Sequence, residues 1–308
     1  MKAAADAGTL EAGRLDDVGV RFGNVWALRH ASAVIPAGSV VAVVGTNGAG
    51  KTSLIRALVG LQPLSEGSIA VLGGRLRTND PADLARIGYV GQRKPLYGYL
   101  RVREMLRYGQ VTNPGWNSAF AAQRVRDVGI DPNKRIEQLS GGQRTQIALT
   151  MALAKQPDLL VLDGPLSDLD PLARQQVLAG LMADVAERGI TVVLSSHILG
   201  EPESTCDQVI ALHAGRLVLA GDIDTIIGGH LQLTGPADAL EQLSRQGQII
   251  DHQREGASTR ALVRLTVDAR FLDPRWQRHP VGMDTVVLGY LRGQRFDPQV
   301  GPHLQVAS

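Results

Sequence analysis

A glycine-rich segment of this chain has the spacing of a loop that binds phosphate groups. Residues 45–52 read GTNGAGKT and match the pattern G-x-x-x-x-G-K-T between a predicted strand and a predicted helix. The glycines leave backbone N–H groups free to face phosphate oxygens. Lys51 is expected to reach the β- and γ-phosphates of ATP, and Thr52 to ligate Mg²⁺. The predicted binding residues are Gly45, Asn47, Gly48, Ala49, Gly50, Lys51, Thr52 and Ser53.

A carboxylate is expected on the Mg²⁺ side of the same site. Asp163 follows four apolar residues, 159–162, which indicate a buried strand. An aspartate at the end of a strand supplies the second Mg²⁺-side group in P-loop enzymes. The alternative is an ordinary solvated charge at a strand end. The phosphate loop favours the metal role.

A second segment has the features of a phosphate cradle. Residues 139–143 read LSGGQ, so that a serine N-cap is followed by two glycines at the start of a predicted helix. An ordinary helix cap after a turn is the alternative interpretation. One nucleotide does not need two cradles from one chain, whereas two chains placed head-to-tail would use both. The residues expected to contact the partner's ATP are Ser140, Gly141, Gly142 and Gln143.

The elements that position these residues alternate along the chain between strands and helices. Such alternation predicts an α/β fold with a mainly parallel sheet, whose ligands bind at the carboxyl ends of the strands. A short hairpin is predicted at 67–77 and mostly helical structure at 96–135, broken at 113–115. The other expected strands are 39–44, 87–90, 159–162 and 190–194, and the other expected helices are 51–61, 140–155 and 171–188.

The chain is expected to have three parts. Residues 1–13 are small and polar and predict a loose tail, and residues 14–230 form the ATP-binding domain, with a helical subdomain at about 93–156. Residues 231–308 are expected to form a small accessory α+β domain. In it, 261–267 alternate like a half-exposed strand. Five apolar residues have the spacing of one helical face: Met283, Val286, Val287, Tyr290 and Leu291.

Composition limits the classes of function. The 308 residues carry a formal net charge of only +2, so no nucleic-acid partner is expected. Cys206 is the only cysteine, which excludes an intrachain disulfide and fits a reducing compartment; we interpret it as a small buried side chain. No apolar run approaches the ~20 residues of a membrane helix. If the protein acts at a membrane, another chain must cross it.

The motifs occur in the order found in the nucleotide-binding domains of ABC transporters, which residues 14 to about 225 resemble. That family implies a P-loop NTPase fold with a parallel sheet core, an antiparallel β subdomain and a helical subdomain. It implies a contact to the γ-phosphate from His197, and a link from Gln92 to Mg²⁺, the γ-phosphate and a transmembrane permease. The segments that carry the resemblance are the phosphate loop, LSGGQ, Asp163 with its strand, 167–170 and 195–197.

Two further roles are implied by the same resemblance. Asp170 corresponds to a contact across the dimer, and Phe22 to the aromatic residue that stacks on adenine. Closer similarity is to the ATPase subunits of bacterial ABC-2-type exporters, including residues 113–116 and 273–291. The family therefore implies a cytoplasmic subunit on the inner face of the membrane that couples ATP binding and hydrolysis to export. Residues 93–100, which mix basic and aromatic side chains, form either a permease interface or an internally packed loop.

One departure from the family pattern affects hydrolysis. The family usually has a glutamate after the strand-end aspartate, where it orients or deprotonates the attacking water, but this chain has Gly164. Loss of a positioned base typically lowers the rate by ~10²–10⁴, or roughly 3–5 kcal/mol of barrier. Asp168 is a nearby carboxylate, but there is no geometric reason to expect it to take the role of the missing glutamate. We expect either a heterodimer whose second site is complete or a homodimer in which both sites hydrolyse slowly.

Two other functional classes share part of this pattern. A soluble, non-transport ABC ATPase that acts as a regulatory or mechanical switch would share all the motifs, but such proteins usually carry two cassettes or a long coiled-coil insertion. A GTPase or small-molecule kinase would share only the phosphate loop. Residues 133–136 read NKRI and do not complete the guanine-reading N-K-x-D pattern.

Overall fold

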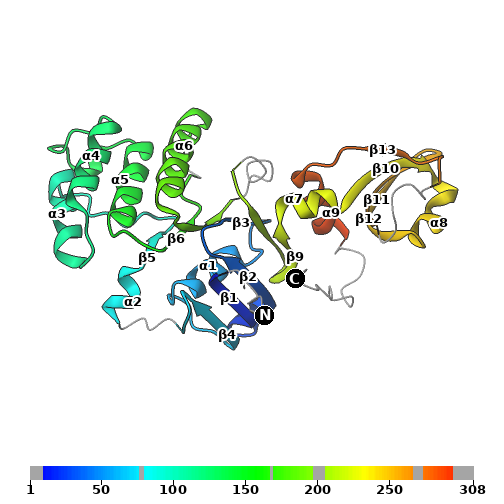
Figure 1. Cartoon of the computed structure of the whole chain (residues 1–308), viewed down its shortest axis with the longest axis horizontal. Helices are drawn as coiled ribbons and strands as arrows, with labels where there is room; N and C mark the ends of the chain where they lie inside the picture. The colour runs from blue at the N-terminus through cyan, green and yellow to red at the C-terminus, as the bar shows by residue number, and fades with distance from the viewer. Residues whose placement is uncertain (1–9, 76–79, 167–168, 197–204, 266–272, 294–308) are drawn as a thin grey trace, which may run out of the picture.

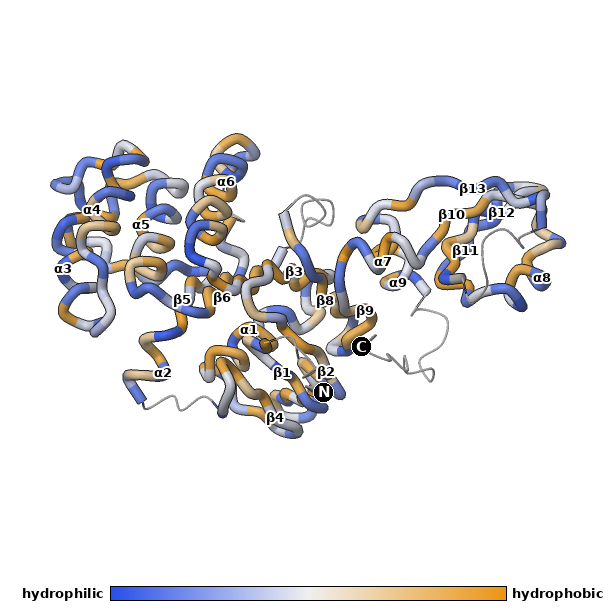
Figure 2. Tube along the Cα trace, viewed as in Figure 1, coloured by the Kyte–Doolittle hydropathy of each residue, from blue (hydrophilic) through white to orange (hydrophobic). Residues whose placement is uncertain are grey.

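The computed structural model describes residues 10–75, 80–166, 169–196, 205–265 and 273–293. In this part of the chain, helices α3 and α4 lie at one end and the sheet of β10 to β13 at the other, with a central sheet between them (Figure 1). Figure 2 shows hydrophobic residues along the central strands β3, β6 and β8 and more hydrophilic residues on the outer helices. No helix among the described residues is long and apolar enough to cross a membrane.

The central sheet places the phosphate loop beside the strand that ends in Asp163. Its order is β5-β6-β7-β3-β8-β9. All neighbouring pairs are parallel except β8 and β9. Every residue of β3, β6 and β7 is buried, as expected of apolar strands covered on both faces. The strands are β3 (Val40–Gly45), β5 (Ile87–Val90), β6 (Leu159–Asp163), β7 (Thr191–Ser195), β8 (Gln208–His213) and β9 (Arg216–Asp222).

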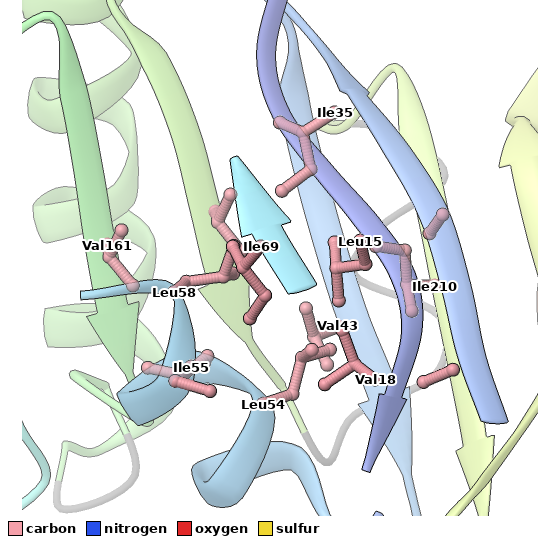
Figure 3. Packing of buried hydrophobic residues seen from close by; sticks show 14 of the residues in the cluster. Leu15, Val18, Ile35, Val43, Leu54, Ile55, Leu58, Ile69, Val161 and Ile210 are labelled. Atoms are coloured by element: carbon pink, nitrogen blue, oxygen red, sulfur yellow. The ribbon is translucent and has the colours of Figure 1, made fainter. Parts of the chain in front are cut away.

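Helix α1 (Lys51–Leu58) and a three-stranded antiparallel sheet cover one face of the central sheet. Leu54, Ile55 and Leu58 lie on one side of α1 because of their helical spacing. They pack in one core with Val43 and side chains from the antiparallel sheet (Figure 3). That sheet has the order β2-β1-β4, formed by β1 (Glu11–Phe22), β2 (Val25–Pro36) and β4 (Glu66–Val71).

The helical subdomain holds the LSGGQ segment at the start of its longest helix. Asn113 ends α3, and the Asn117 side chain caps α4 by accepting from the Phe120 N–H, so the predicted break lies between two helices. Arg124 of α4 pairs with Asp184 of α6, which joins the subdomain to the central domain. The helices are α2 (Pro81–Ala85), α3 (Val102–Thr112), α4 (Ser118–Asp127), α5 (Gly141–Leu153) and α6 (Pro171–Arg188).

A four-stranded antiparallel sheet follows the central domain. Its order is β11-β12-β10-β13. The elements are α7 (Ile223–Gly228), β10 (His230–Pro236), α8 (Leu240–Ser244), β11 (Gly247–Glu255), β12 (Ser258–Leu265), β13 (Gln277–His279) and α9 (Met283–Gly293).

His230, the first residue of β10, connects this sheet with two helices. Its ring lies 2.6 Å from the Ile226 carbonyl oxygen of α7 and 3.0 Å from the Tyr290 hydroxyl of α9.

Helix α9 shares its core with the central sheet. Val286 and Val287 are buried in one cluster with Ala42 and Val44 of β3. The same cluster contains Leu262 of β12, so α9 packs between the two sheets. In Figure 1, α7 and α9 lie between β9 and the accessory sheet. Helix α9 of the expected accessory domain therefore helps to cover the strand that leads into the phosphate loop.

Two local predictions differ from the structure, and a third is described only in part. Strand β1 begins at Glu11, so residues 11–13 belong to it, because Ala12 packs into the core. Of the hairpin expected at 67–77, the structure describes residues 67–75: strand β4 and a tight turn closed by an antiparallel bridge between Val71 and Gly74, with residues 76 and 77 outside the described part of the chain. Residues 261–263 are all buried, because Leu262 faces the α9 cluster while Ala261 and Val263 face another core.

Candidate functional site

A cavity of about 280 Å³ lies where β3 and β6 end, and it brings the predicted phosphate and Mg²⁺ groups together. Gln92 reaches it from the segment after β5. Gly45 of the predicted set lies in β3 and does not line it. Its lining residues are Ala27, Asn47, Gly48, Ala49, Gly50, Lys51, Thr52, Ser53, Gln92, Asp163, Gly164, Ser195 and Ser196.

The glycines of the loop are needed at their positions for different physical reasons. A Cβ on Gly45 would lie 2.3 Å from the Leu212 carbonyl oxygen, and one on Gly50 would lie 2.4 Å from that of Ala27. These two positions also have φ of 149° and 107°, which side chains disfavour. Gly48, with φ of 78°, faces open space. Close backbone contacts thus require Gly45 and Gly50, whereas Gly48 leaves room above the loop for a ligand.

Lys51 begins α1 and directs its ammonium group back into the loop. Its Nζ donates to the carbonyl oxygens of Gly45, at 2.7 Å, and Thr46, at 2.9 Å. Burial lowers the pKa of Lys51, and the negative charge of Asp163 opposes this shift. A half-buried ammonium beside open backbone N–H groups is a strong attractor for phosphate oxygens.

Thr52 and Asp163 meet on the other side of the loop. The Thr52 hydroxyl donates to Asp163 Oδ1 at 3.2 Å, although the two residues are far apart in sequence. Asp163 is only 5% exposed. Hydroxyl and carboxylate oxygens suit Mg²⁺, which binds few protein ligands and keeps water and substrate phosphates. Among the described residues, no group of three or more His, Cys, Asp or Glu side chains is placed to hold a metal ion.

Ser195 connects the strand-end aspartate with the residue that follows it. Its hydroxyl donates to Asp163 Oδ1 at 3.0 Å and accepts from the Gly164 N–H at 2.8 Å. Ser195 lies opposite Asp163 in the register of β7 and β6. Gly164 has φ of 56°, in the left-handed region. Neither Ser195 nor Ala27 was predicted for this site, because their proximity depends on which strands are neighbours.

The LSGGQ segment forms a capped helix start away from the cavity. The Ser140 Oγ accepts from the Gln143 N–H, and the Gln143 Oε1 accepts from the Ser140 N–H, both at 3.2 Å. Ser140 and Gly141 are exposed. None of the described lining residues of the nucleotide cavity comes from 140–143. The helix start is thus presented outward rather than to the chain's own loop.

Comparison with known proteins matches this geometry. The family described as ABC transporter matches residues 28–167. The phosphonates import ATP-binding protein PhnC of Frankia casuarinae is 34% identical over 236 residues, which cover 70% of this chain and 93% of PhnC. This chain belongs to the ATP-binding subunits of ABC transporters. A solved structure of an ATP-binding subunit of an ABC transporter has a TM-score of 0.63 and 28% identity, covering 70% of this chain and 91% of that one.

Other relatives of this ABC subunit match over part of their length. The molybdenum import protein ModC of Rhodobacter capsulatus is 38% identical over 196 residues, 61% of this chain and 53% of ModC. The Fe(3+) import protein FbpC 1 of Rhodococcus jostii is 36% identical over 214 residues, 67% of this chain and 61% of FbpC 1. The chain thus spans about half to three-fifths of these two relatives. All three named relatives serve import, so they give no support to the exporter similarity inferred from sequence.

The remaining family positions of this ABC subunit lie outside the cavity or outside the described residues. Asp170 caps α6 by accepting from the Ala173 N–H at 2.9 Å. Phe22 is 54% exposed at the end of β1 and does not line the cavity. His197 and Asp168 lie outside the described residues.

Proposed function

We propose that this chain binds Mg-ATP in the cavity above α1 and couples the nucleotide cycle to a separate membrane permease. The observation that carries the proposal is the convergence of Lys51, Thr52 and Asp163 on one cavity from separate elements, with Thr52 and Asp163 in direct contact. Bound Mg²⁺ would neutralise phosphate charge. The protein would then act at the inner face of the membrane through its permease.

We further propose that two ATP-binding chains close head-to-tail over two nucleotides. The outward-facing start of α5 supports this, because its N–H groups carry the positive end of a helix toward a neighbouring molecule. Each site would then combine the loop of one chain with residues 140–143 of the other. A partner chain that carries a glutamate at the position of Gly164 would supply one complete site. The alternative is a homodimer in which ATP binding carries the signal and both sites hydrolyse slowly.

Slow hydrolysis follows from the groups around Gly164. Glycine supplies no base, and the Ser195 hydroxyl already donates its proton to Asp163. A neutral hydroxyl is too weakly basic to take a proton from an attacking water, so neither group supplies a general base. ATP binding does not require a base at position 164, because the loop, Lys51 and Thr52 are complete. We infer that binding and hydrolysis are separated in this subunit.

The direction of transport and the substrate depend on the permease. The relatives named above serve import, so we do not propose export as the direction of transport. A second cavity, of about 630 Å³, supports docking of the permease. It runs between the segment after β5 and α5, with Arg93, Lys94 and Arg144 in its lining, and Gln92 lines both cavities. A permease segment seated there would sense the nucleotide through Gln92.

Replacing Lys51 with alanine should weaken Mg-ATP binding at least about tenfold, because a charge-assisted contact to the phosphates is lost. Equilibrium titration of the purified chain with a fluorescent ATP analogue measures this. The matched control is Lys134→Ala, which removes an exposed lysine of the helical subdomain that does not line the nucleotide cavity. Equal affinity of wild type and Lys51→Ala would contradict ATP binding at this loop.

A further inference from the structure

Ser195 is the one hydroxyl of β7 that touches the predicted Mg²⁺-side carboxylate. Three hydrogen bonds meet at this point: from Thr52 to Asp163, from Ser195 to the same Asp163 oxygen, and from the Gly164 N–H to Ser195. All three donor–acceptor distances lie between 2.8 and 3.2 Å. Asp163 and Ser195 are both buried, so water does not compete freely for these groups.

Two hydroxyls, from Thr52 and Ser195, donate to the same oxygen, Asp163 Oδ1. The contact from Thr52 would be exchanged for the metal when Mg²⁺ binds, since the same hydroxyl is the predicted ligand. The contact from Ser195 has no such second role, because its oxygen also accepts from the Gly164 N–H. Ser195 can therefore keep the carboxylate oriented while Thr52 turns to the metal. Outer-shell hydrogen bonds of this kind orient metal-binding carboxylates.

We propose that Ser195 is a positioning residue that orients the Asp163 carboxylate for Mg²⁺. This rests on the proposed Mg-ATP site. Gly164 has a left-handed backbone, and a hydrogen bond from its N–H to a neighbouring strand holds that turn against β7.

Ser195→Ala should weaken ATP binding in excess Mg²⁺ about tenfold, the effect of losing one hydrogen bond to a charged group. In EDTA, with no metal for Asp163 to hold, its ATP affinity should equal that of the wild type. The probe is a fluorescent ATP analogue titrated into the full chain. Thr191→Val is the matched control, because it removes a buried hydroxyl at the opposite end of β7, where that hydroxyl accepts from the Gly38 N–H and does not line the nucleotide cavity.

A double-mutant cycle completes the test. In an Asp163→Asn background, Ser195→Ala should cause no additional loss of Mg-ATP affinity, because its effect passes through the carboxylate. Equal losses in Mg²⁺ and EDTA, an unchanged affinity in Mg²⁺, or additive losses in the double mutant would each overturn the proposal. Failure of the wild type to bind Mg-ATP would instead overturn the proposed function, so the two failures are distinguishable.

Discussion

Replacing Gly164 with glutamate should raise the steady-state ATPase rate of the purified chain by about tenfold to a hundredfold. The substitution would supply a carboxylate beside Asp163, at the mouth of the nucleotide cavity that Gly164 lines. A positioned general base typically contributes ~10²–10⁴ in rate. The lower range is expected here because the surrounding residues have not been selected to orient this side chain. Release of inorganic phosphate at saturating Mg-ATP measures the rate.

Backbone strain opposes this gain but does not cancel it. Gly164 has φ of 56°, where a residue with a Cβ costs roughly 1–2 kcal/mol. That cost is smaller than the roughly 3–5 kcal/mol of barrier that a base removes. Gly164→Gln is the matched control, because it has the same strain and size without a base, and its rate should stay at the wild-type level. Equal rates for the glutamate and glutamine variants would contradict the role assigned to this position.

Replacing Val286 with aspartate should lower the free energy of unfolding by about 3 kcal/mol or more, because it buries a carboxylate without a partner. Val286 is fully buried, in one cluster with Ala42 and Val44 of β3. Strand β3 runs directly into the phosphate loop at Gly45. The damage should therefore reach the nucleotide site, with weaker ATP binding as well as a melting temperature lower by roughly 10 °C.

A charge on the other side of the same helix provides the control. Leu288 is 36% exposed, and Leu288→Asp should change the melting temperature by only a few degrees. Melting followed with and without Mg-ATP separates the two variants. If Val286→Asp unfolds only the C-terminal sheet and leaves ATP binding intact, α9 is not a structural part of the ATP-binding domain.

Local signals made part of this fold predictable from sequence. Helix α6 spans Pro171–Arg188 as expected, because Asp170 caps its start, proline occupies its first turn and Gly189 ends it with φ of 65°. Strand β5 also has its predicted bounds. The phosphate loop was recognisable because its glycines, lysine and threonine are contiguous. Where a motif or cap is encoded by adjacent residues, its position follows from the sequence.

Features that depend on distant packing could not be predicted. The spacing of apolar residues in α9 indicates a buried face, but the choice of β3 as its partner depends on how the sheets are arranged. The same limit applies to 261–263, which are covered from two sides by separate cores. Ser195 approaches Asp163 only because β7 lies beside β6 in the sheet. The sequence separation of Ser195 and Asp163 does not indicate that their strands are neighbours in the sheet.

The central claim is that this subunit binds Mg-ATP but hydrolyses it slowly at its own loop. A single-turnover experiment tests it most directly: the purified chain in excess over ATP labelled at the γ-phosphate, with bound nucleotide and released phosphate followed together. The claim predicts stoichiometric binding and phosphate release at least about a hundredfold slower than the ~10 s⁻¹ turnover of a median enzyme. Release at about 10 s⁻¹, or a failure to bind ATP, would contradict it.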